Sequence, residues 1–198
     1  MKPVVILDFD GPLFPEKIFL YPQNKGTVAD DKCCELNLHS KVTYWYADPF
    51  AIAILNELKE KYDYKLVISS SWADENLHNK EQIENLLKAN GLVYDLHEDW
   101  KTRRSGKRDE ERATQIEEWL SRHPEVGEHY FVLDDTKSAP ELFFEKTYLT
   151  STIDQRNVYL AHEKDGFSYE QFTDMDFLMG YWQEKEMKKS TVKSSNLK

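Results

Sequence analysis

Three runs of apolar residues stand far apart along the chain, and each ends abruptly in polar residues. They lie at 4–7, 64–68 and 130–133 and are rich in Val, Ile and Leu. Uninterrupted apolar runs of this length are typical of strands buried on both faces of a parallel sheet. The pattern therefore predicts three central strands.

Helix signals separate these runs. Asp48 followed by Pro49 is typical of a helix start, Asn90-Gly91 of a helix end, and His123-Pro124 closes a third amphipathic stretch. Shorter apolar stretches predict a short strand at 92–94, edge strands at 147–149 and 158–160, and a last helix from about 168 to 184. Strands that alternate with helices predict an α/β fold: a Rossmann-like three-layer sandwich with a central parallel sheet and helices on both faces.

The chain of 198 residues is long enough for one domain with a substantial core. We expect that domain to span 1–184, with an insert at 14–47 that is rich in aromatic and turn residues. Residues 185–198 mix lysines with Ser, Thr and Asn, which predicts a flexible tail or linker.

Composition narrows the class of protein. A net charge of −10 argues against a duplex nucleic-acid binder, because phosphate neutralisation needs clustered Lys and Arg. No apolar run reaches membrane-spanning length, and Met1 is not followed by a signal-peptide pattern. Cys33 and Cys34 are adjacent and cannot form a long-range intrachain disulfide. We therefore expect a cytoplasmic protein with no membrane segment.

The polar residues at the three strand ends carry the candidate chemistry. Asp8 and Asp10 follow the first strand, a serine triplet (Ser69, Ser70, Ser71) the second, and Asp134 with Asp135 the third. The carboxyl ends of parallel strands share one edge of a sheet, where α/β folds bind ligands. Carboxylates gathered there repel one another unless a cation joins them, so a divalent metal is expected.

This set of side chains suits phosphoryl transfer. One carboxylate attacks phosphorus and forms an aspartyl-phosphate, and a second acid protonates the leaving oxygen and then activates water. A hydroxyl and a cationic side chain hold the phosphoryl oxygens, with Mg²⁺ offsetting the negative charge.

These motifs resemble those of the haloacid dehalogenase (HAD) superfamily, from about Met1 to Asp135. Asp8-Phe9-Asp10-Gly11 is similar to its Asp-x-Asp-Gly motif, which implies that Asp8 is the nucleophile and Asp10 the acid/base. The second aspartate also implies a phosphatase or mutase, since true dehalogenases lack it. The resemblance implies a Mg²⁺ site at Asp8, Asp10 and the acidic pair, with Asp135 a direct ligand and Asp134 nearby or acting through water.

Two motifs leave alternatives open. Either Ser70 or Ser69 fits the strand-end hydroxyl; we prefer Ser70 and expect Ser69 and Ser71 near the substrate. Arg112 fits the cation at the start of the helix that leads into the acidic-pair strand, with Lys107 and Arg108 as the alternatives. Trp72, beside the serines, could stack on a substrate ring, but we expect a core or rim aromatic.

Two other interpretations were weighed. Asp-x-Asp-Gly also occurs in calcium-binding loops, but Pro12, Leu13 and Phe14 supply no further side-chain oxygen ligands. A degenerate HAD fold that serves only as a binding module is disfavoured, because every catalytic residue type is present.

The expected substrate follows from the small insert. It has room for an elongated flap but not for a full cap, so the chain resembles the capless members, whose open sites admit phosphates on macromolecules. The negative charge favours a phosphorylated protein, and the aromatic flap favours phosphotyrosine, as in the HAD phosphotyrosine phosphatases of intracellular bacterial pathogens. The alternative is a nucleotidase or polynucleotide end phosphatase. It rests on a likeness to nucleic-acid repair HAD domains in Ser-Ser-Ser-Trp and in the helix containing Gln115-Ile116 and Trp119-Leu120.

Overall fold

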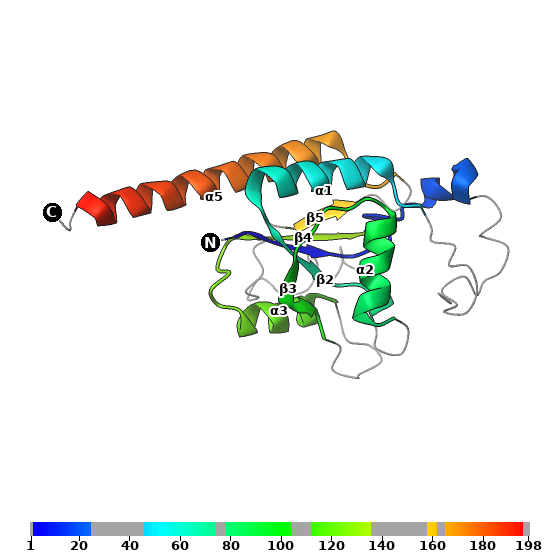
Figure 1. The fold of residues 1–198 in the computed structure, drawn as a ribbon, viewed down its shortest axis with the longest axis horizontal. Helices are drawn as coiled ribbons and strands as arrows, with labels where there is room; N and C mark the ends of the chain where they lie inside the picture. The colour runs from blue at the N-terminus through cyan, green and yellow to red at the C-terminus, as the bar shows by residue number, and fades with distance from the viewer. Residues whose placement is uncertain are drawn as a thin grey trace.

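A computed structural model describes residues 2–24, 46–73, 78–103, 112–135, 158–161 and 165–195. Within them the chain forms a five-stranded sheet in the order β3-β2-β1-β4-β5 (Figure 1), and every neighbouring pair is parallel. The strands are β1 (Val4–Leu7), β2 (Lys65–Ile68), β3 (Leu96–Lys101), β4 (Tyr130–Asp135) and β5 (Val158–Ala161). The predicted α/β class is confirmed.

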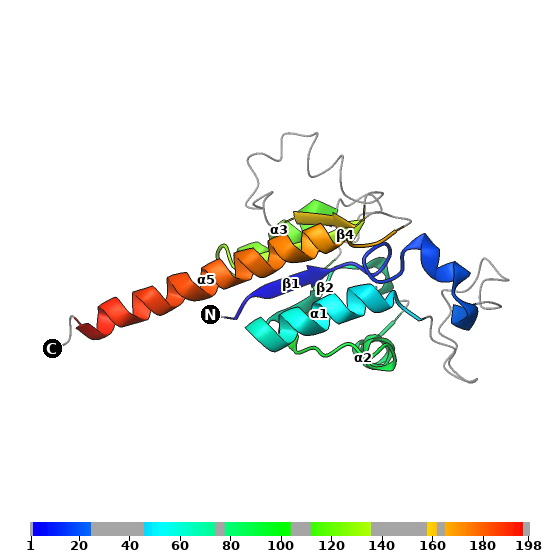
Figure 2. The ribbon, with the colours of Figure 1, turned by 90° about the horizontal axis from the view of Figure 1, so that it is seen from above.

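Four α-helices and three short 3-10 helices complete the described part. They are η1 (Glu16–Leu20), η2 (Pro22–Asn24), α1 (Pro49–Tyr62), η3 (Ser71–Ala73), α2 (Lys80–Ala89), α3 (Arg112–Arg122) and α5 (Tyr169–Ser195). Helices α1 and α5 run side by side over one face of the sheet, and α3 lies on the opposite face (Figures 1 and 2).

Two separate cores fill the spaces between these layers, because successive strand residues point to opposite faces. Val5 and Leu7 of β1 pack into the core that also holds buried side chains of α1, α2 and α5. Val4 and Ile6 pack into the second core, against α3. All four are at most 2% exposed, as expected for a central strand of a three-layer sandwich.

The predicted helix boundaries are largely confirmed. The Asp48 side chain accepts a hydrogen bond from the Phe50 N–H, and Pro49 occupies the first position of α1. Helix α2 begins with a capping box between Asn79 and Gln82. Both devices satisfy N–H groups that the first helical turn leaves without partners.

The prediction of a strand at 92–94 is wrong, because β3 begins at Leu96. Leu92 is buried just after Gly91, whose φ of +75° ends the preceding helix, and it belongs to a loop. Strand β3 itself reads Leu-His-Glu-Asp-Trp-Lys and is only partly buried. As an edge strand it lacks the apolar run that marks the central ones.

The last helix is also longer than predicted, since α5 continues through Ser195 rather than giving way to a tail after 184. Trp182 is buried against the domain, and the Lys185 ammonium lies 2.5 Å from a Glu128 carboxylate oxygen. Both contacts hold the helix to the domain near residue 184, where a tail was expected. The Lys and Glu residues that follow are also good helix formers, which favours continuation of the helix.

Several predictions concern residues outside those that the structure describes. They include the central part of the 14–47 insert (residues 25–45), Cys33 and Cys34, the strand at 147–149, and the alternative cations Lys107 and Arg108. Among the helices of the described residues, none has an apolar stretch long enough to cross a bilayer.

Candidate active site at the carboxyl edge of the sheet

The loop after β1 is a tight turn that carries Asp10. The N–H of Phe14 donates to the Phe9 carbonyl (2.9 Å), and Gly11 has a φ of +76°. A Cβ atom on Gly11 would lie 2.2 Å from the Cβ of Asp135. Glycine is therefore required twice here, for its left-handed backbone and for the close approach of β4.

Three buried carboxylates converge beside this turn. Asp8, Asp134 and Asp135 each place a carboxylate oxygen within 4.8 Å of the others, and all three are at most 5% exposed. The register of the sheet causes this meeting, because Leu7 of β1 is paired with Leu133 of β4. Backbone groups hold two of the carboxylates: the Phe9 N–H donates to Asp8 Oδ1 (2.7 Å) and the Asp135 N–H to Asp134 Oδ1 (2.8 Å).

Arg112 is the first residue of α3, which lies on the sheet face opposite α1 and α5, and its side chain extends to the three carboxylates. Its Nη2 lies 3.4 Å from Asp8 Oδ2 and its Nε 3.7 Å from Asp134 Oδ2, while Nη1 donates to the Ser69 carbonyl. The preferred cation thus lies at the site. Its guanidinium pairs with two of the three carboxylates, Asp8 and Asp134.

The serines after β2 point in different directions. The Ser69 hydroxyl accepts from the Thr102 hydroxyl (3.2 Å) and is buried toward β3, so it does not face the acids. The Ser70 side chain hydrogen-bonds to Asp8 and also accepts from the Trp72 N–H (3.3 Å). Of the two alternatives, the geometry therefore favours Ser70. Ser71 is half-buried at the start of η3.

Burial and mutual repulsion raise the pKa values of both motif aspartates. For Asp8, loss of hydration raises the pKa, whereas Arg112 and the hydrogen bonds from Ser70 and the Phe9 N–H oppose the rise. Loss of hydration, followed by repulsion from Asp8, raises the pKa of Asp10 to about 6. The site disfavours further negative charge, and a bound cation would relieve that cost.

The carboxylate group has the chemistry of a Mg²⁺ site. Mg²⁺ prefers hard oxygen ligands, and Asp8, Asp134 and Asp135 offer them close together. Asp10 was expected among the ligands, but its carboxylate lies outside this group. As a whole residue Asp10 is exposed, but its carboxylate lies beside the buried acids, where hydration is reduced, and accepts a hydrogen bond from Trp72 Nε1 (3.2 Å).

A comparison with known protein families matches residues 4–158 to the HAD domain in Swiss Army Knife RNA repair proteins. The chain belongs to this HAD family. The match confirms the resemblance seen in the motifs, and with the parallel sheet it identifies a Rossmann-like HAD fold. It makes the protein a hydrolase of the phosphatase type. No curated protein and no solved structure matches the chain.

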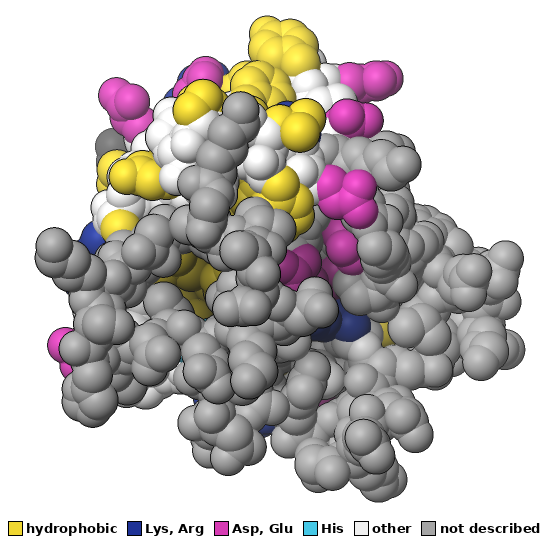
Figure 3. Space-filling model, turned by 90° about the vertical axis from the view of Figure 1, so that its right-hand side faces the viewer, with side chains coloured by type: hydrophobic (Ala, Val, Ile, Leu, Met, Phe, Trp, Pro, Cys, Tyr) yellow, Lys and Arg dark blue, Asp and Glu magenta, His cyan; other side chains and the backbone are white. Residues whose placement is uncertain are grey.

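Figure 3 views the HAD domain from the side toward which the central strands run. Acidic and basic side chains appear there next to one another, between residues drawn in grey. A neighbouring exposed area is hydrophobic, so this face combines charged and apolar surface.

Sequence reasoning missed one residue and one contact that shape the site. Thr102 hydrogen-bonds to the Ser69 hydroxyl, but it follows β3, the strand that the apolar pattern did not reveal. Trp72 is a half-buried aromatic packed on the core, as expected, but the contact of its indole N–H with Asp10 was not foreseen.

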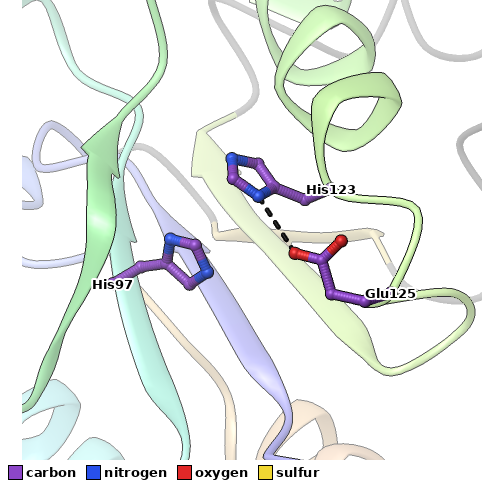
Figure 4. A group of neighbouring side chains, drawn as sticks. All are labelled: His97, His123 and Glu125. Carbon is purple, nitrogen blue, oxygen red and sulfur yellow. Dashed lines mark hydrogen bonds and ion pairs between the residues drawn. The ribbon is translucent and has the colours of Figure 1, made fainter.

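A second group of metal-type side chains lies away from this edge of the HAD domain. His97 of β3, His123 and Glu125 point toward one another in Figure 4, with potential ligand atoms within 4.8 Å. His123 lies between two acids: Nδ1 is 3.1 Å from a Glu125 oxygen and Nε2 is 3.2 Å from Asp99 Oδ2. Asp99 also accepts from Arg122 (2.9 Å).

Hydrogen bonding argues against a metal in this second group. His97 Nδ1 accepts the backbone N–H of Asp99 (3.1 Å), so a neutral His97 carries its proton on Nε2. A protonated nitrogen cannot ligate a metal, and both nitrogens of His123 already face acids. We assign these residues to a structural network that ties the end of α3 to β3, and name it the β3–α3 network: His97, Asp99, Arg122, His123 and Glu125.

Proposed function

We propose that this HAD protein is a Mg²⁺-dependent phosphomonoesterase that acts through an aspartyl-phosphate on Asp8. The observation that carries the proposal is that the carboxylates of Asp8, Asp134 and Asp135 lie together in a buried position, with Arg112 paired to Asp8 and Asp134. A bound Mg²⁺ would offset the repulsion between these carboxylates and an anionic phosphate.

In the first step, a carboxylate oxygen of Asp8 attacks phosphorus while the bond from phosphorus to the leaving oxygen breaks. The leaving oxygen takes a proton from the carboxyl group of Asp10. The products are the free alcohol or phenol and a phosphoryl group bound to Asp8.

In the second step, Asp10 has become a carboxylate and accepts a proton from water. The water oxygen attacks phosphorus, and the bond between phosphorus and the Asp8 oxygen breaks. Inorganic phosphate leaves and both aspartates return to their starting states. Arg112 and Ser70 stabilise charge on the phosphoryl oxygens during both steps, because each already contacts Asp8.

For the substrate we favour a terminal phosphomonoester on an RNA strand. The support is the matched family, whose description places its HAD domain in RNA repair proteins. The net charge of −10 does not oppose this choice as it opposes duplex binding, since an end phosphate needs only a local cation such as Arg112.

Phosphotyrosine is the second candidate, and a cluster of aromatic rings favours it. Phe9, Phe14 and Trp72 contact one another beside Asp10, with Phe14 and Trp72 stacked at 5.1 Å. Phe9 and Phe14 are buried, so the half-buried Trp72 is the ring of this cluster that a phenyl group could contact, and it would suit a nucleobase equally well.

The activity test is hydrolysis of p-nitrophenyl phosphate with and without Mg²⁺, using Asp8→Asn as the control. We expect turnover by the wild type that requires Mg²⁺ and is lost in Asp8→Asn. Equal rates for the two proteins would refute the proposal.

The substrate test compares four phosphates at equal concentration: 3′- and 5′-phosphorylated oligoribonucleotides, a phosphotyrosine peptide and a phosphoserine peptide. We expect the highest kcat/KM for one of the two oligonucleotides. A higher value for the phosphotyrosine peptide would select the second candidate.

A further inference from the structure

Trp72 joins two parts of the candidate active site that come from different strands. Its indole Nε1 donates to Asp10 Oδ2 (3.2 Å) in the loop after β1. Its backbone N–H donates to the Ser70 hydroxyl (3.3 Å) at the end of β2. A hydrogen bond to the proposed acid/base is not needed for a residue that only fills the rim.

The indole ring is held firmly in place. It stacks on Phe14 with a centroid distance of 5.1 Å and an interplanar angle of 6°, and meets the edge of Phe9 at 5.7 Å. His78 Nδ1 lies 2.8 Å from the Trp72 carbonyl oxygen and fixes the backbone. Phe9 and Phe14 belong to the same turn as Asp10, so the indole and the carboxylate are positioned by one rigid unit.

We propose that Trp72 is a positioning residue that orients the Asp10 carboxyl group for proton transfer to the leaving oxygen, a role that rests on the proposed function. The indole N–H donates to Oδ2, and because a carbonyl oxygen is the better acceptor, this bond favours the proton of the neutral acid on Oδ1. The bond also limits rotation of the carboxyl group. Oδ1 is thereby directed to the leaving oxygen, and it is the same oxygen that later takes the proton from water.

This role predicts an effect that depends on the leaving group. A poor leaving group such as an alkoxide needs protonation as its bond to phosphorus breaks, whereas p-nitrophenolate leaves without it. A residue that supports only the fold would slow all substrates alike.

The experiment compares kcat/KM of wild type and Trp72→Phe on p-nitrophenyl phosphate, phenyl phosphate and glycerol phosphate. Phenylalanine keeps a ring in place but removes the N–H, and the backbone bond to Ser70 is retained. We expect a fall of about tenfold or more with glycerol phosphate, and of less than about threefold with p-nitrophenyl phosphate. Trp119→Phe is the matched control, because its indole N–H donates to the Asp99 carbonyl (2.9 Å) in the β3–α3 network.

A double-mutant cycle with Asp10→Asn tests whether Trp72 acts through Asp10. We expect Trp72→Phe to have no further effect on the burst of phenol release in the Asp10→Asn background. If Trp72→Phe does not fold, Phe14→Leu replaces it. That variant keeps the N–H but removes the stacked ring, and we expect the same leaving-group dependence at smaller size.

An equal fall on all three substrates, no fall at all, or a full effect of Trp72→Phe in the Asp10→Asn background would each overturn the role of Trp72 while leaving the phosphatase proposal standing. A wild type that hydrolyses none of these phosphates would instead remove the proposed function, and this role with it.

Discussion

Two clusters of charged side chains in this HAD protein differ in burial and in charge balance. At the carboxyl edge, Asp8, Asp134 and Asp135 are almost fully buried, and Arg112 pairs with two of them, Asp8 and Asp134. In the β3–α3 network, acids and bases alternate: Arg122 forms an ion pair with Asp99, and His123 hydrogen-bonds to both Asp99 and Glu125.

The difference is the one expected between a candidate functional site and a structural network. Partly exposed ion pairs satisfy one another and add modestly to stability. Burial disfavours the ionised form of Asp8, a bound cation would relieve that cost, and buried acids of this kind are found at functional sites. Both groups have metal-type residues, so charge balance and hydrogen bonding separate them better than residue type does.

The largest effect is expected from Asp8→Asn. We expect kcat to fall by about a thousandfold or more, because the nucleophile is lost. The free energy of unfolding without Mg²⁺ should rise, since a raised pKa means that the folded state pays to ionise Asp8. Activity assays and thermal unfolding check both. Asp99→Asn is the contrasting variant, with reduced stability and unchanged kcat; a fall in kcat there would contradict the division between the clusters.

Gly11→Ala should come next. The methyl group would meet the Cβ of Asp135 at 2.2 Å, and the left-handed backbone adds strain. We expect a loss of unfolding free energy on the order of 2 kcal/mol or more and a severe loss of activity. Gly91→Ala is the matched control: it shares the positive φ of +75° but has nothing within 4 Å of the added carbon. Similar losses in both variants would show that strain alone is responsible.

Mg²⁺ should stabilise one cluster only. At a concentration of 100 times its Kd, a ligand adds about 2.7 kcal/mol to the free energy of unfolding. We expect a rise in Tm with added Mg²⁺ for the wild type and for His97→Gln, and a much smaller rise for Asp135→Asn. A Mg²⁺ response that survives in Asp135→Asn but disappears in His97→Gln would reverse our assignment of the two clusters.

The smallest effect concerns pH and the β3–α3 network. Burial, followed by repulsion from His123, lowers the pKa of His97 below its usual 6.5, against the attraction of Asp99 and Glu125. The unfolded chain therefore takes up a proton at His97 at a higher pH than the folded protein does. Its contribution to stability is lost as the pH falls below about 6.5 and becomes constant below the folded pKa. Chemical unfolding between pH 7.5 and 5 should show less loss for His97→Gln than for the wild type.

Much of the site was predictable because a buried parallel strand has a distinctive sequence. The runs before Asp8 and Asp134 identified their strands, and the shared sheet edge implied that these side chains would meet. The choice between Ser69 and Ser70 was open because it depends on where β2 ends and which way each residue points. The sequence of β3 contains no apolar run, so neither this strand nor the contact of the following residue, Thr102, with Ser69 could be predicted.

The contact between Trp72 and Asp10 could not be predicted for another reason. It joins loops after two different strands, and its geometry depends on how Phe14 packs under the indole. Sequence patterns show where a residue lies along a strand or helix, but they do not give the side-chain rotamer of a residue in a loop.

Helix α5 has a practical consequence. The family match ends at residue 158, yet the sheet face under this helix is closed by Met175, Met179 and Trp182, which are each at most 5% exposed. A version of the protein trimmed to the family boundary would lose these three side chains and expose to water the sheet face and the part of α1 that they cover. Recombinant work should therefore treat the long C-terminal helix as part of the folding unit rather than as an appendage.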